Sequence, residues 1–169
     1  MEAKMNRQKY NLLLLVLLPF LITNCSLVKQ QHNCDYIHTK SKLYHLLKTY
    51  EQLDIKIMEP DSGFVEKYEL TIEQPLDHKN PGNGSFKQLI FLSHRGFKAP
   101  TVLHTEGYSA GHNFCAELPL LLEGNEVRVE HRFFGKSKPD SMNWQFLNIQ
   151  QAAADHHAIV ELFKKIYPG

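Results

Sequence analysis

The chain has 169 residues, of which 43% are hydrophobic and 22% are charged. This is ordinary usage for one globular domain, and it excludes a disordered chain, a collagen-like chain and a disulfide-dense miniprotein. The net charge of +1 gives no basic field that would indicate a nucleic-acid partner. The ten histidines are scattered, without His-Glu-x-x-His or Cys/His ligand spacing, so we predict neither a metal site nor a cofactor.

The N-terminus has the pattern of an export signal. Three basic residues precede an apolar run at 12–22, which is too short to span a bilayer comfortably. Residues 21–25 resemble a lipoprotein signal, in which the cysteine becomes the lipidated first residue of the mature protein. We therefore predict a signal peptide over 1–24, lipidation of Cys25, and a periplasmic, outer-membrane or secreted location. A plain cleaved signal and an uncleaved anchor are the alternatives.

Residues 25–40 are polar and irregular, so we predict a tether there and a folded domain over 41–169. If Cys25 carries lipid, Cys34 and Cys115 remain, and an exported protein can pair them. Two unrelated free thiols are the alternative.

Strand and helix patterns alternate along the predicted domain. In chain order we predict a helix at 42–53, a strand at 64–74, a turn-rich loop at 77–85, strands at 86–92 and 101–103, a helix at 113–122, a strand at 127–131 and a helix at 148–167. The first two strands form an antiparallel hairpin, and the later alternation implies parallel strands. The predicted fold class is α/β with a mixed sheet.

The last helix has the clearest pattern. Asn148 and Gln151 have the spacing of a capping box, and a Pro-Gly pair after Tyr167 is a stop signal. We expect one apolar face of this helix to cover the sheet, made of Ile149, Ala152, Ala153, His156, Val160, Phe163 and Tyr167.

Residues 107–111 match Gly-x-Ser-x-Gly, the pattern of a nucleophile elbow. In the α/β-hydrolase order, however, the acid and the histidine follow the serine from later strands, and only one predicted strand follows Ser109. We therefore assign no catalytic role to Ser109, and a minimal esterase that uses it remains an alternative.

Counting strands favours another role for this stretch. It follows the third predicted strand, where α/β-hydrolases place a loop that supplies one oxyanion N–H. We predict that Gly107 and Tyr108 form this oxyanion loop; a plain structural turn is the alternative. Glu106, Glu130 and Arg132 lie at the same end of the sheet, where such folds bind ligands. We predict that they form a charged network under the site, or a buried ion pair that only holds two loops.

Three stretches resemble a known family: Glu73–His78, Thr105–Tyr108 and Val129–Ser137 are similar to secreted bacterial tripeptidyl aminopeptidases of the serine type, and to the related Pro-X carboxypeptidases and dipeptidyl peptidases. The resemblance covers residues 64–169. It implies the N-terminal part of an α/β-hydrolase domain, in an exopeptidase that releases short peptides, often ending in proline, from free N-termini.

The resemblance also implies that the family's catalytic serine, aspartate and histidine lie beyond Gly169. We therefore predict that the chain is truncated before the nucleophile elbow, contains no catalytic residue and is inactive alone. A peptide would be the substrate of the full-length enzyme. A non-catalytic truncated lipoprotein is the alternative.

Overall fold

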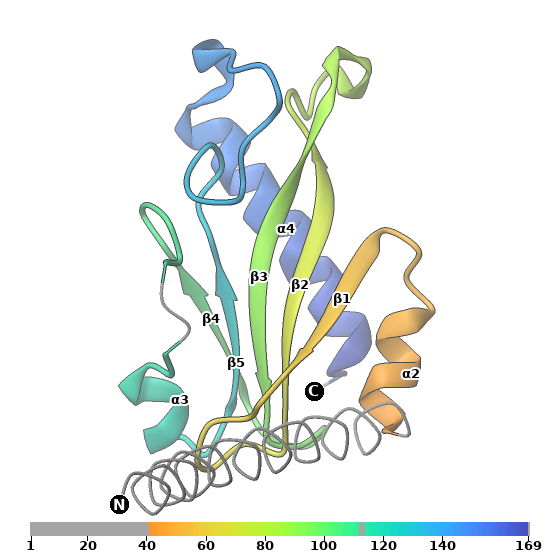
Figure 1. Cartoon of the computed structure of the whole chain (residues 1–169), viewed down its shortest axis with the longest axis vertical. Coiled ribbons are helices and arrows are strands. Elements are labelled where there is room, and N and C mark those ends of the chain that lie inside the picture. Colours follow the sequence, from red (N-terminus) through yellow and green to blue (C-terminus); the bar gives the residue numbers. More distant parts are fainter. Residues whose placement is uncertain (1–40, 112–113, 169) are drawn as a thin grey trace, which may run out of the picture. The chain divides into compact units, whose positions relative to one another are not determined.

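The computed structural model describes residues 41–111 and 114–168 (Figure 1). The elements are, in chain order, α2 (Lys42–Lys48), β1 (Leu53–Met58), β2 (Glu66–Pro75), the 3-10 helix η1 (Pro81–Asn83), β3 (Ser85–His94), β4 (Thr101–Thr105), α3 (Glu117–Leu121), β5 (Asn125–Val129), the 3-10 helix η2 (Trp144–Phe146) and α4 (Ile149–Ile166). The predicted signal, tether, Cys25 and Cys34 lie outside the described residues. Within them, no helix is long and apolar enough to cross a membrane.

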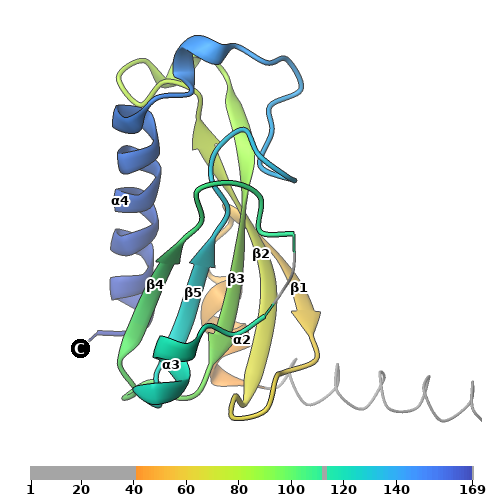
Figure 2. The same ribbon diagram turned by 90° about the vertical axis from the view of Figure 1, so that its left-hand side faces the viewer.

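The five described strands form one mixed sheet in the order β1-β2-β3-β5-β4 (Figures 1 and 2). β2 and β3 form the predicted antiparallel hairpin, and β4 and β5 are the predicted parallel pair. β5 joins the hairpin by pairing antiparallel with β3. The expected α/β class with a mixed sheet is confirmed, and β4 is an edge strand of the described sheet.

β1 corrects the prediction of a helix over 42–53. The helix ends at Lys48, where the N–H groups of Thr49 and Tyr50 donate to carbonyl groups three residues earlier. Leu53 continues the helical spacing of the leucines before it, which extended the predicted helix too far. Residues 53–57 alternate apolar and charged side chains instead, and this period of two suits pairing with β2.

The main core lies between the sheet and the helices α2 and α4. It contains Leu43 and Leu47 of α2, Leu53, Tyr68, Leu70, Ile72, Ile90, Leu92, Val127 and Val129 of the sheet, and Ile159, Leu162, Phe163, Ile166 and Tyr167 at the end of the chain. Figure 2 shows α4 running alongside the sheet, with its first turn at the end where the β2–β3 connection lies. The core thus fixes α4 against the strands by direct apolar burial.

The buried face of α4 differs in part from the predicted one. Ala152, Phe163 and Tyr167 are buried as predicted, whereas Ile149 is 82% exposed. The other buried residues, which were not predicted, include Gln151, Asp155, Ile159 and Leu162. The helix is therefore rotated relative to the expected apolar stripe. The reason is that two polar side chains near its start find buried hydrogen-bond partners, which a count of apolar residues cannot foresee.

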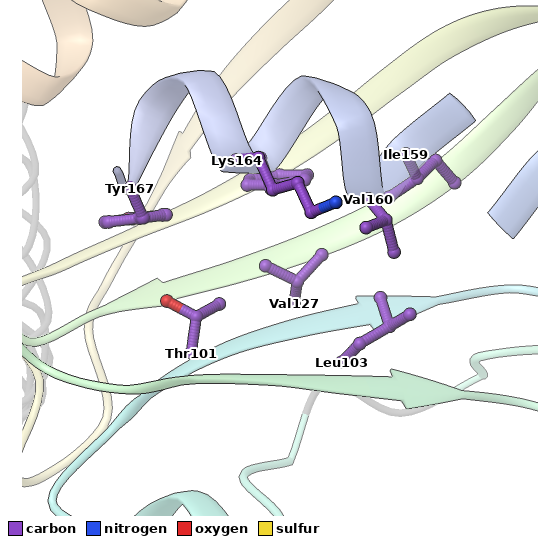
Figure 3. Close-up of a pocket in the computed structure, with 8 residues that line it drawn as sticks. Thr101, Leu103, Val127, Ile159, Val160, Lys164 and Tyr167 are labelled. Atoms are coloured by element: carbon purple, nitrogen blue, oxygen red, sulfur yellow. The ribbon is translucent and has the colours of Figure 1, made fainter. Parts of the chain in front are cut away.

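An apolar groove lies between α4 and the strands β4 and β5 (Figure 3). Its volume is about 150 Å³, and it is lined by Thr101, Leu103, Val127, Ile159, Val160, Phe163, Lys164 and Tyr167. Leu103 of the edge strand stays 36% exposed there. The groove is an apolar surface that the described residues do not fill.

Candidate active site

Two loops meet at the carboxyl ends of the parallel strands. Residues 106–111, the glycine-rich loop, follow β4, and residues 130–137 follow β5. The two loops are joined where the N–H of His131 donates to the carbonyl of Tyr108, at 3.1 Å. Ligands of open α/β sheets bind beyond these strand ends, so this is the candidate site.

The glycine-rich loop is held at both ends and open in the middle. The N–H of Glu106 donates to the Val129 carbonyl at 2.9 Å, and the N–H of Ala110 donates to the Glu130 carboxylate at 2.8 Å. Between them, Gly107, Tyr108 and Ser109 are exposed, and their N–H groups have no hydrogen-bond acceptor among the described residues. Such donors are available to an outside acceptor, including a developing oxyanion.

Ser109 lacks the backbone of a nucleophile elbow. An elbow serine lies on a sharp, strained turn directly between a strand and a helix. Ser109 is four residues past the end of β4 and eight before α3, and its φ is not in the left-handed region. Within the described part of the chain, no imidazole or carboxylate is hydrogen-bonded to its hydroxyl group. The absence of a nucleophilic role for Ser109 stays a prediction.

The three charged residues predicted to form one network have separate partners. Glu106 pairs with Arg128 of β5, with 2.5 Å between Oε1 and Nε. Glu130 and Arg132 are not paired with each other. Glu130 faces the glycine-rich loop, and Arg132 pairs with Asp155 of α4. The prediction of a single network is therefore wrong. The chain turns between Glu130 and Arg132, so their side chains reach different elements.

Glu130 is 1% exposed, and neutral donors surround its carboxylate. Besides the Ala110 N–H on Oε2, its Oε1 accepts from the N–H groups of Lys136 and Ser137 at 2.7 and 2.8 Å, and from the Ser137 hydroxyl at 2.8 Å. A Cβ on Gly135 would lie 2.0 Å from Oε2, and Gly135 has φ +50°. Only glycine therefore fits at position 135, where the loop that follows β5 surrounds the carboxylate.

Arg132 is fully buried and uses all five of its N–H donors. Nε and Nη2 donate to the two carboxylate oxygens of Asp155 at 2.7 and 2.9 Å. The remaining donors reach the carbonyls of Pro75, Leu76 and Phe146 at 2.7 to 3.1 Å. The bidentate ion pair joins Arg132 to Asp155 of α4, and the other N–H groups of Arg132 bind carbonyls elsewhere. Arg132 therefore connects the β2–β3 connection and the 130–148 segment to α4.

The first turns of α4 also hold the β2–β3 connection. Asn148 caps the helix by accepting from the Gln151 N–H at 3.0 Å, as predicted, but the Gln151 side chain does not return to the cap. It binds the Asp77 carboxylate and the His78 N–H instead, each at 2.9 Å. Side-chain hydrogen bonds from Asn80 and Gln151 lower the pKa of Asp77 from 3.8 to about 2.

A hollow of about 470 Å³ lies beside the loop that follows β5. It is lined by His131, Phe134, Leu147, Asn148, Ile149, Ala152, Ala153 and His156. The Phe134 ring packs edge-on against Tyr108 of the glycine-rich loop, with 5.2 Å between centroids. Burial lowers the pKa of His156, which favours its neutral form. The hollow therefore has a mostly apolar lining, and its Phe134 ring contacts the glycine-rich loop through Tyr108.

The sequence analysis did not predict three partners of the charged residues, namely Asp155, Arg128 and Ala110. Asp155 carried a usable signal, since an acidic residue among apolar positions of a long helix indicates a buried partner. Arg128 alternates with valines in β5 and could be found in the same way. Ala110 takes part only through its backbone N–H, for which side-chain identity gives no signal.

Cys115 is half-buried, and burial followed by the nearby Glu126 raises its pKa to about 11. Because Cys34 lies outside the described residues, the pairing of these two cysteines stays a prediction. No group of three His, Cys, Asp or Glu side chains in residues 41–111 and 114–168 is arranged to hold a metal ion.

Residues 48–169 match the sequence profile of the family described as PS-10 peptidase S37. The chain is also similar to the prolyl tri/tetrapeptidyl aminopeptidase of Streptomyces mobaraensis, with 38% identity over 131 residues. The match covers 70% of this chain and 28% of that relative, so the chain spans less than a third of the relative's length.

Proposed function

The chain belongs to the peptidase S37 family, and on that premise we propose that it supplies the oxyanion loop of an exported serine exopeptidase. The full-length enzyme would release short peptides, tripeptides above all, from free N-termini. Proline before the cleaved bond is the proposed preference, since the similar Streptomyces protein is named a prolyl tri/tetrapeptidyl aminopeptidase. The nucleophile, acid and general base would come from chain beyond residue 169.

One observation carries the assignment of the loop. The N–H groups of Gly107 and Tyr108 lack acceptors among the described residues and lie between two hydrogen-bonded anchors at the carboxyl end of a parallel strand. A tetrahedral intermediate carries its negative charge on the former carbonyl oxygen. Preorganised N–H donors aimed at that oxygen lower the barrier, by roughly 3 kcal/mol for one donor.

The edge of the sheet supports the position proposed for the nucleophile. β4 lies at the edge, and the apolar groove beside it exposes Leu103 (Figure 3). A further apolar parallel strand along β4 would cover this groove. We propose that this strand ends in the Gly-x-Ser-x-Gly elbow, so that the serine lies next to the loop that follows β4.

The test compares this chain with the product of the complete reading frame that contains it. We expect the full-length protein to hydrolyse Ala-Ala-Pro-anilide, and the 169-residue chain alone to leave it intact. In the full-length protein, Gly107→Val should lower kcat by about a hundredfold with KM little changed, because the side chain blocks an approach used in the transition state.

Gly96→Val is the matched control. A Cβ at Gly107 or at Gly96 meets nothing within 4 Å, so neither variant is expected to disturb the fold. Normal turnover in Gly107→Val would contradict the oxyanion assignment. Hydrolysis by the 169-residue chain, lost on Ser109→Ala, would instead show that Ser109 is a nucleophile.

We propose export with lipidation at Cys25 as the location of this enzyme. The support is the basic start, the short apolar run and the cysteine at its end. Metabolic labelling with a palmitate analogue should tag the wild-type protein and miss Cys25→Ala. Equal labelling of the two proteins, or of neither, would contradict lipidation, and recovery of both in the cytoplasm would contradict export.

A further inference from the structure

We propose that Glu130 is a positioning residue for catalysis: its Oε2 holds the glycine-rich loop in the place where its N–H groups meet the oxyanion. This inference rests on the function proposed above. Glu130 itself touches no reacting atom. It acts through the N–H of Ala110, three residues after Gly107.

The backbone of Glu130 is anchored to the sheet. Its N–H donates to the Leu89 carbonyl of β3 at 3.0 Å, and its carbonyl accepts from the Gln88 side chain at 2.8 Å. The three donors on Oε1 then fix the direction of the side chain. Oε2 is therefore a fixed acceptor on the rigid part of the fold.

Ala110 connects this acceptor to the open part of the loop. It is 3% exposed and packs with Leu89 and Phe91 of β3, while residues 107–109 before it are exposed. Its N–H bond to Oε2 fixes the far end of that exposed segment. Loss of the bond would leave the segment held by the contacts of Glu106, His131 and the Ala110 methyl group.

Small displacements of oxyanion donors have large kinetic effects, since a misplacement of 1 Å can cost about a hundredfold in rate. Because the loop N–H groups act on charge that develops in the transition state, such a displacement lowers kcat more than it changes KM. A residue that only stabilised the fold would instead lower the amount of folded enzyme and leave the kcat of each folded molecule unchanged.

The experiment uses Glu130→Gln in the full-length protein, assayed with Ala-Ala-Pro-anilide. The glutamine keeps the size of the side chain, and its single oxygen satisfies the three donors of Oε1. Its NH2 group then faces the Ala110 N–H, and two donors cannot bond. We expect kcat to fall about tenfold to a hundredfold, with KM within about twofold.

Glu126→Gln is the matched control. Glu126 is also a buried carboxylate, and it accepts from the Ala116 N–H at 3.3 Å and from His104 at 3.2 Å, and neither partner bonds to Ala110 or Glu130. Its kcat per folded molecule should equal that of the wild type. Ala110→Pro is the second variant: it removes the N–H and leaves the carboxylate with its other donors, and it should lower kcat as Glu130→Gln does.

Hydrogen exchange measured on the same proteins gives an independent readout. Peptides that contain Ala110 should exchange faster in Glu130→Gln than in the wild type. In Glu126→Gln their exchange rate should equal that of the wild type. Normal kcat in Glu130→Gln, an equal fall in both glutamine variants, or unchanged exchange at Ala110 would each overturn the positioning role. If Glu130→Gln does not fold, normal kcat in Ala110→Pro overturns it. An inactive wild-type protein would mark failure of the proposed function itself.

Discussion

Glu130 and Arg132 are two residues apart, both are buried, and they serve different regions of the molecule. Glu130 has only neutral donors around it and holds an exposed loop with unpartnered N–H groups. Arg132 has a charged partner, Asp155, and holds the β2–β3 connection against α4. The first cluster lies at the candidate site, and the second joins secondary-structure elements far apart in the sequence.

The difference between the two clusters lies in what removal of one member leaves behind. A buried ion pair that loses one partner leaves an uncompensated charge, which is strongly destabilising. A buried carboxylate replaced by its amide leaves no charge and only disturbs the donors that faced it. We therefore expect changes at Arg132 to affect folding and changes around Glu130 to affect turnover.

The largest expected effect is on stability. Arg132→Ala should lower the free energy of unfolding by about 3–5 kcal/mol, because Asp155 then loses its bidentate cation and keeps only His78, at 2.7 Å, as a partner. Urea unfolding followed by circular dichroism measures the change. The double variant Arg132→Met with Asp155→Leu should recover part of the loss, since it removes both charges but still leaves three carbonyls and the His78 ring without these partners. A loss below about 1 kcal/mol in the single variant would contradict the ion-pair account.

An intermediate effect is expected at Gly135, which lies against the Glu130 carboxylate. Gly135→Ala places a methyl group in a left-handed conformation and 2.0 Å from Oε2, so the carboxylate must move. Strain of this kind costs about 1–3 kcal/mol, and kcat of the full-length protein should fall as well. Gly96→Ala is the control, because its Cβ meets nothing within 4 Å. Equal stability and turnover in the two variants would show that Glu130 is not tightly held.

The smallest expected effect is a pH dependence at Asp77. Its pKa is about 2 in the folded chain, below the ordinary 3.8, because hydrogen bonds from Asn80 and Gln151 favour the carboxylate. The resulting stabilisation is fully present above about pH 4 and is lost as the pH falls through 4 towards 2. Asp77→Asn should therefore be less stable than the wild type at pH 6, and this difference should shrink by pH 2. A difference that does not change between these two pH values would contradict the assigned pKa.

Local patterns predicted much of the sheet and its last helix. The β2–β3 hairpin follows from the alternation of apolar and charged residues around a turn-rich loop, and α4 follows from its cap and its 3.6-residue period. The two loops of the candidate site were also found, since glycines and charged residues cluster after two short apolar strands. Strand β1 was missed because its first leucine also fits the helical spacing that precedes it.

The sequence by itself determined most of the segments that become strands and helices, because these depend on residues a few positions apart. Only the tertiary structure decided that Glu130 meets Ala110 and that Arg132 meets Asp155, 20 and 23 residues away along the chain. The rotation of α4 was decided in the same way, since Gln151 and Asp155 are buried by partners from the β2–β3 connection and the loop after β5. A buried polar side chain takes its place from the partner that satisfies it, and that partner is brought near only when the sheet and helix pack.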